Sequence, residues 1–213
     1  MGRIVQGANG GFRGKAGSVI GSAWRDVEYI KGRPKPSSKA PSLRQLEQQL
    51  KFSMAVRFLR PIKDLLNFSY DSLKKGRATG FNMALRQVLA HAVQGTYPDY
   101  EINYAAVQLA SGPLAIAEGS ATAEAGGVIR VEWAPDISMH NRFADDEVTV
   151  LIYDPHTNIY SNGLSGKFRA DGEMEITMRS NLVGRSMQVY YFFTNRDGKL
   201  VSPSFYAGQV VLI

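Results

Sequence analysis

The chain of 213 residues contains no cysteine, so disulfide bonds, thiolate metal sites and cysteine nucleophiles are excluded. It has no apolar run of about 18 residues, the length that a membrane-spanning helix requires. Its first thirty residues lack the apolar segment of a signal peptide and are interrupted by Arg3, Arg13, Lys15 and Arg25. We therefore expect a protein that is cytoplasmic as synthesised and makes no membrane contact, unless it joins a released particle or is exported by a non-classical route.

Motifs for catalysis or cofactor binding are also missing. In the phosphate-loop register Asn9 stands where the first glycine belongs, and Ala16 replaces the hydroxyl that would hold magnesium. The acidic run Asp145-Asp146-Glu147 has neither a further ligand cluster nor the spacing of an EF-hand. The three histidines are isolated in the sequence: His91, His140 and His156. We predict no enzymatic activity, no metal and no cofactor.

What the chain does have is an uneven distribution of charge. Residues 1–60 carry twelve Lys and Arg against three acidic residues, a net charge of +9. Residues 101–213 carry eight against thirteen, a net charge of −5. Opposite charges of this kind attract neighbouring copies to one another, and a basic region also attracts nucleic acid. The alternative is that both signs lie on solvated faces without a partner.

The front of the chain is rich in glycine and has the pattern of a hairpin. Strands at about 17–24 and 27–32, joined across Arg25-Asp26, would pair Trp24 with Val27, Ser22 with Tyr29 and Ile20 with Lys31. An isolated two-stranded hairpin is marginal in water, so it must dock on its own body or complete a sheet elsewhere. A basic connector with three prolines follows up to Pro41 and favours an extended conformation.

Residues 42–100 read as three short helices. Ser42 and Gln45 fit a capping box, and apolar residues recur at helical spacing up to Phe58. Pro61 stops or kinks the first helix and starts the second, and a third runs from about Phe81 to Val93.

From Glu101 the period changes to two. Seven strand candidates follow, at residues 101–110, 127–135, 147–155, 158–164, 172–178, 186–195 and 204–213. With Trp133 on an early strand, this pattern favours a seven-stranded sandwich of the immunoglobulin or fibronectin type III kind, and a small barrel is the rival. The predicted fold class is therefore α+β, with a hairpin arm at 1–41, a helical segment at 42–100 and an independently folding sandwich at 101–213.

Five motifs resemble an uncharacterised family of proteins of about 200 residues from the Bacteroidota, a domain of unknown function. They lie at Gly10 to Trp24, Tyr29 to Pro41, Gln45 to Phe52, Phe58 to Tyr70 and Gly95 to Tyr104. The resemblance covers nearly the whole chain and implies no activity, cofactor or functional residue.

Two functional hypotheses follow from the residues. The first is a non-enzymatic structural protein, a filament or virion-type subunit, which forms a homo-oligomer or larger assembly when its arm pairs with an open sheet edge of another copy. It assigns assembly to Phe12, Gly14, Gly17, Gly21, Trp24 and Tyr29. The second is nucleic-acid binding by the basic front. It assigns contacts to Arg13, Lys15, Arg25, Lys31, Arg33 and Lys35.

Overall fold

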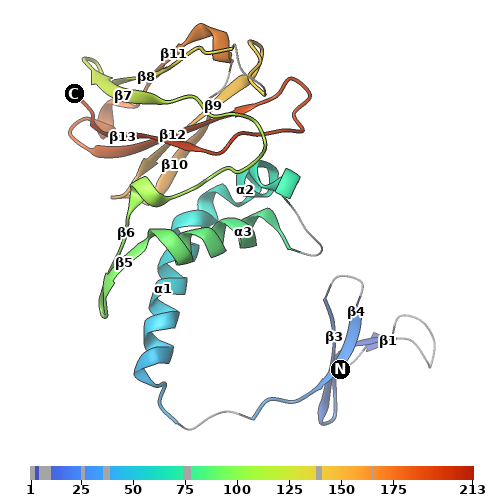
Figure 1. Ribbon diagram of the computed structural model, residues 1–213. Helices are drawn as coiled ribbons and strands as arrows, with labels where there is room; N and C mark the ends of the chain where they lie inside the picture. Colours follow the sequence, from blue (N-terminus) through green and yellow to red (C-terminus); the bar gives the residue numbers. More distant parts are fainter. Residues whose placement is uncertain are drawn as a thin grey trace. The chain divides into compact units, whose positions relative to one another are not determined.

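The protein consists of two compact units, residues 1–42 and 43–213. The computed structural model describes residues 3–4, 11–24, 27–35, 39–73, 78–137, 141–164 and 166–213 (Figure 1).

The first unit is an antiparallel sheet with the strand order β1-β2-β3-β4. Its strands are β1 (Arg3–Ile4), β2 (Phe12–Ala16), β3 (Val19–Trp24) and β4 (Val27–Gly32). The predicted hairpin register is confirmed, since Trp24 pairs with Val27, Ser22 with Tyr29 and Ile20 with Lys31. The hairpin is not isolated, however, because β2 adds a third strand along β3 and β1 pairs with β2.

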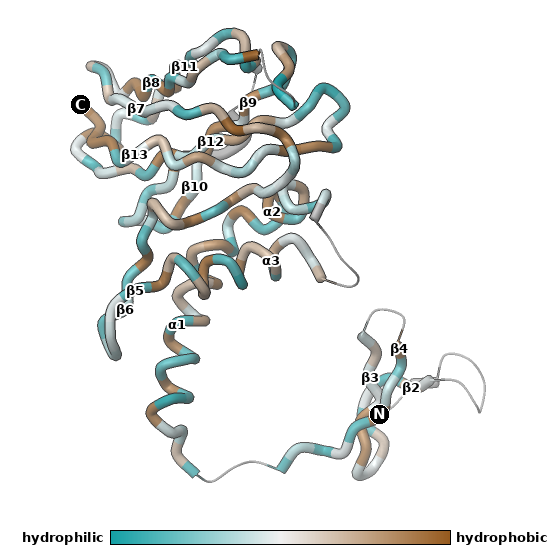
Figure 2. Tube along the Cα trace, viewed as in Figure 1, coloured by the Kyte–Doolittle hydropathy of each residue, from teal (hydrophilic) through white to brown (hydrophobic). Residues whose placement is uncertain are grey.

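The second unit begins with three helical segments. The α-helices are α1 (Leu43–Leu59), α2 (Lys63–Ser69) and α3 (Gly80–Gln87). A 3₁₀ turn at Arg60–Ile62, which contains Pro61, separates the first two, as that proline predicts. Further 3₁₀ turns lie at Asp71–Leu73, Tyr104–Ala106, Arg169–Asp171 and Ser180–Leu182, and a π-helical turn at Val88–Ala92 extends α3. Hydrophilic and hydrophobic residues alternate along α1 (Figure 2).

Nine strands lie among the described residues of the second unit. They are β5 (Val93–Thr96), β6 (Asp99–Ile102), β7 (Gly119–Glu124), β8 (Val128–Trp133), β9 (Glu147–Asp154), β10 (Ile159–Leu164), β11 (Glu173–Thr177), β12 (Ser186–Thr194) and β13 (Phe205–Val211). Strands β5 and β6 form a hairpin, and the others form a three-stranded sheet, β11-β8-β7, and a four-stranded sheet, β10-β9-β12-β13. All pairings are antiparallel.

The two larger sheets pack face to face around one core. Trp133 of β8 lies with its ring centroid 6.1 Å from that of Tyr191 and 6.0 Å from that of Phe193, both on β12. Val131 and Ile129 join the same cluster and are fully buried. The protein is thus α+β with a two-sheet, sandwich-like body rather than a closed barrel, and the finer assignment to the immunoglobulin or fibronectin type III topology stays a prediction.

The opposite face of the four-stranded sheet is covered by the helices (Figure 1). Phe58 of α1 packs edge-on against Tyr153 of β9, with ring centroids 4.9 Å apart, and shares a cluster with Tyr190 and Phe192 of β12. Residue 100 is therefore no boundary between compact units, because helices and strands share one core across it. The predicted boundary near residue 41 lies at the observed division.

Six of the seven strand candidates are strands, and one is not. Residues 101–110 leave the sheet after Ile102 and enter the 3₁₀ turn Tyr104–Ala106, because Val107, Leu109 and Ala110 fill the core between helices and sheet. The seventh sandwich strand is β7. Its sequence, Gly-Ser-Ala-Thr-Ala-Glu, has no large apolar residue and gave no strand signal.

Candidate functional sites

The N-terminal sheet presents a face that carries both aromatic and cationic side chains. Side chains directly opposite one another on paired strands lie on the same face. Three rows result: Lys15–Ile20–Lys31, Ser22–Tyr29 and Trp24–Val27. We call these seven residues the basic–aromatic face.

This face is open in the structure. Trp24 is 55% exposed, Tyr29 43% and Val27 41%, and every residue of β4 is exposed. The ammonium of Lys31 lies 6.0 Å from the ring centroid of Tyr29. Among residues 11–24 and 27–35, Gly21 is the single buried residue, so the described part of the sheet has no core of its own.

Two positions of the sheet, one in a strand and one in a turn, require glycine. A Cβ at Gly21 would lie 1.9 Å from the carbonyl oxygen of Phe12, so β2 and β3 can approach only because Gly21 lacks a side chain. Gly17 adopts φ +60° in the turn between these strands, which agrees with its prediction as a bend. Gly21 thus has a close approach to Phe12 within the same chain.

The remaining predicted interaction residues divide into three groups. Gly14 lies in β2 opposite Gly21. The other cations assigned to nucleic acid are exposed: Arg13, Arg33 and Lys35. Arg25 lies outside the described residues. The structure therefore brings Lys15, Lys31, Trp24 and Tyr29 together on one face.

A second surface, missed in the sequence, lies on the outer side of the three-stranded sheet. Glu173 pairs with Glu132, and Glu175 pairs with Arg130, so these four side chains share one face. Arg130 Nε lies 2.7 Å from Glu124 Oε1, and its guanidinium also contacts Glu173 and Glu175. Glu124, with the other two carboxylates, raises the pKa of Arg130. Four carboxylates against one guanidinium make this acidic face net negative.

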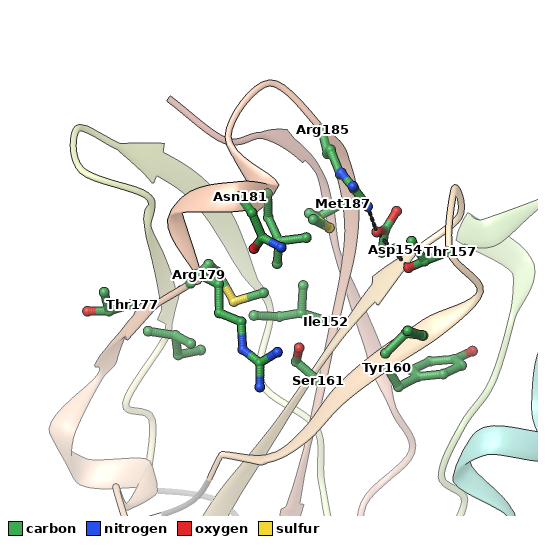
Figure 3. A pocket seen from close by; sticks show the side chains of 14 residues that line it. Ile152, Asp154, Thr157, Tyr160, Ser161, Thr177, Arg179, Asn181, Arg185 and Met187 are labelled. Atoms are coloured by element: carbon green, nitrogen blue, oxygen red, sulfur yellow. Dashed lines mark hydrogen bonds and ion pairs between the residues drawn. The ribbon is translucent and has the colours of Figure 1, made fainter.

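A cavity of about 440 Å³ opens between β10 and β11, which are the outer strands of their sheets (Figure 3). Its floor is apolar and is lined by Ile152, Ile176, Met178, Leu182 and Met187. Two arginines, Arg179 and Arg185, lie among the lining residues together with Asp154, Ser161 and Asn181. We call it the edge cavity.

Within the edge cavity, Asp154 neutralises Arg185. Arg185 Nη1 donates to Asp154 Oδ2 at 2.8 Å, and the hydroxyl of Thr157 donates to the same oxygen at 2.7 Å. Burial raises the pKa of Asp154, but the hydrogen bonds from Thr157, Arg185 and the His156 backbone N–H outweigh it, so its pKa is lowered. Asp154 is therefore a carboxylate at neutral pH.

The comparisons with known proteins identify a family. A family model described as a family of unknown function (DUF6266) matches residues 11–208. The chain belongs to this family. The match spans both compact units, so the N-terminal sheet from β2 onward is part of what defines DUF6266. A search of curated proteins found no match.

The description of the family names no activity, and the described titratable residues form no recognisable site. In the described ranges no three His, Asp or Glu side chains gather as a metal site would require, and no helix there is long and apolar enough to cross a membrane. His140 lies outside those ranges, and His91 and His156 are exposed. Asp146, weighed above as a calcium ligand, instead forms a buried ion pair, with Arg169 Nε 3.0 Å from its Oδ2.

Proposed function

We propose that the protein is a non-enzymatic structural subunit that assembles head to tail through its N-terminal sheet. The observation that carries the proposal is the open basic–aromatic face, where Trp24, Tyr29 and Val27 are each more than 40% exposed on a sheet whose described part lacks a core. Large apolar side chains exposed together mark interaction surfaces, because burying them is favourable by about 25 cal/mol per Å².

The occupant is the acidic face of a second copy. Residues 1–42 carry eight Lys and Arg against two acidic residues, a net charge of +6. The acidic face offers Glu124, Glu132, Glu173 and Glu175 on a sheet, and sheets stack face to face at a separation of about 10 Å. Lys15 and Lys31 then meet carboxylates, while the carboxylates that crowd Arg130 gain further cations.

Such a contact joins two different surfaces of the same chain. A heterologous contact leaves one basic–aromatic face and one acidic face free at the two ends, so it propagates into an open filament or closes as a ring. A filament or virion-type subunit has this property.

The test uses two charge-reversed variants. Lys15→Glu/Lys31→Glu disables the basic–aromatic face, and Glu173→Lys/Glu175→Lys disables the acidic face. In sedimentation velocity, the unmodified protein is expected to form extended assemblies and each variant to sediment as a monomer. An equimolar mixture of the two should associate again, because it retains one intact face of each kind and its two reversed faces also carry opposite charges. Lys199→Glu reverses an exposed charge on a loop outside both faces and is the control.

Two results would refute the proposal. One is an unmodified protein that sediments as a monomer at every concentration, which would place the basic–aromatic face in solvent or on its own chain. The other is a Glu173→Lys/Glu175→Lys variant that assembles as the unmodified protein does. Thermal unfolding of each variant shows separately that it is folded.

A second candidate, binding of single-stranded nucleic acid, is favoured by the same face. Exposed Trp24 and Tyr29 beside Lys15 and Lys31 offer both base stacking and phosphate contacts. Anisotropy with a labelled oligonucleotide separates the candidates. Binding that is lost in Lys15→Glu/Lys31→Glu and kept in Glu173→Lys/Glu175→Lys, in a protein that does not self-associate, would favour nucleic acid.

A further inference from the structure

The edge cavity combines an apolar floor with a single uncompensated charge. Arg185 is neutralised by Asp154. Arg179, by contrast, has neither an ion pair nor a side-chain hydrogen bond within the part of the chain that the structure describes. Its guanidinium extends from the end of β11 across the opening toward Ser161 of β10 (Figure 3). The two arginines therefore differ in their charge partners although both border the same space.

The floor beneath Arg179 suits an aliphatic or aromatic group. Ile176 and Met187 are buried members of the sandwich core, and Ile152 is 1% exposed, so the deepest wall of the cavity is formed by that core. A volume of about 440 Å³ lies within the range of small-molecule sites, which are mostly apolar with a few polar groups that fix orientation. Ser161 and Asn181 supply such groups at the rim.

We propose that the edge cavity binds an apolar small molecule that carries one carboxylate. The guanidinium of Arg179 pairs with the carboxylate, because a planar guanidinium and a carboxylate form two parallel hydrogen bonds. The apolar part lies on Ile176, Met178 and Met187. Because Asp154 already neutralises Arg185, only Arg179 can pair with an anionic group of the ligand, so the ligand carries one negative charge.

The probe is octanoate, with 1-octanol as its neutral counterpart. The full chain is labelled at the terminal methyl groups of Ile and Met, and the methyl resonances are followed by NMR during each titration. Octanoate is expected to shift the signals of Ile152, Ile176, Met178 and Met187 and to leave those of Met54 and Ile62, which belong to the helices, unchanged.

Three substitutions assign the charge contact. Arg179→Gln should weaken octanoate binding about tenfold and leave octanol binding unchanged, because it removes a charge-assisted hydrogen bond. Arg179→Lys retains the charge and should restore part of the affinity. Arg196→Gln removes an exposed arginine elsewhere and is the control that should change nothing.

Any of three outcomes overturns the proposal. The first is the absence of shifts at Ile176 and Met187 at the highest octanoate concentration. The second is octanol binding as tight as octanoate binding. The third is octanoate affinity that Arg179→Gln leaves at the unmodified value. None of these depends on self-assembly, so the proposed function and the cavity ligand are tested separately.

Discussion

Replacing Asp146 by Asn should be among the most damaging changes in the second unit. Asp146 and Arg169 are both fully buried, and Arg169 Nε lies 3.0 Å from Asp146 Oδ2. Asn keeps the size and one acceptor oxygen, so the backbone N–H of Phe143, which donates to Oδ2 at 3.1 Å, can retain a partner. The change thus removes the negative charge and leaves the guanidinium buried without it.

The surroundings of Arg169 compensate only in part. Its Nη2 donates to the carbonyl of Ala115 at 2.8 Å, and its guanidinium carbon lies 3.9 Å from the ring centroid of Phe193. Burial lowers the pKa of Arg169 and Asp146 opposes this, so loss of Asp146 leaves desolvation unopposed by its main counter-charge. Removing one partner of a buried pair costs about 3–5 kcal/mol. For a chain of this size the melting temperature should then fall by roughly 6–20 °C.

Urea unfolding followed by Trp133 fluorescence measures the loss. The indole N–H of Trp133 donates to the carbonyl of Arg169 at 2.9 Å, so the fluorophore is attached to the affected loop, whereas Trp24 is already exposed when folded. The double variant Asp146→Leu/Arg169→Met removes both charges and should recover most of the lost stability. A single variant that loses less than about 1 kcal/mol, or a double variant worse than Asp146→Asn, would refute this reasoning.

Three other changes have defined outcomes. Residues 101–213 produced alone should bind a hydrophobic dye and give a poorly dispersed NMR spectrum, because the helix-facing side of the four-stranded sheet loses its cover; a well-dispersed spectrum would restore the boundary at residue 100. Gly21→Ala should make the N-terminal sheet sensitive to protease while Gly32→Ala, where a Cβ meets nothing within 4 Å, should not; equal sensitivity would contradict the close-approach argument. The pKa of Asp154 is lowered in the folded protein, so its charge stabilises the fold at pH 7 and this stabilisation is lost as the pH falls below 3.8. The loss of stability caused by Asp154→Asn, measured by urea unfolding, should therefore become smaller as the pH is lowered below 3.8. A loss that stays constant with pH would exclude the charge as its cause.

The parts of the fold that sequence reasoning recovered are those with a strong local signal. The register of β3 and β4 followed from a two-residue connection, because such a connection leaves one way to pair the flanking strands. Pro61 marked the break between the first two helices for an equally local reason. Strand β7 was missed because its small and polar residues give no alternation, and residues 103–110 were misread because an apolar run in a loop resembles a strand.

The candidate sites were recovered less well. The predicted hairpin register already placed Trp24, Tyr29 and Lys31 on one face, and the pairing of β2 with β3 adds Lys15 to it. The acidic face and the edge cavity required the pairing of β8 with β11 and the placement of β10 and β11 at the outer ends of their sheets. Neither produces a local motif, since their residues come from separate segments of the chain.

One signal in β12 would have corrected the domain prediction. A sandwich strand with one face in water alternates apolar and polar residues, whereas Ser186–Thr194 is buried at every position after the first, in the manner of a strand covered on both faces. The three-stranded sheet can cover only one of these faces, so the run itself requires another layer, which the helices supply. Strand β4 has the opposite pattern, because Val27, Tyr29 and Ile30 are exposed on a strand that has no second layer among the described residues of its unit. An apolar strand face must be covered to leave water. On β12 the helices provide this cover, and on the N-terminal sheet a partner would have to provide it.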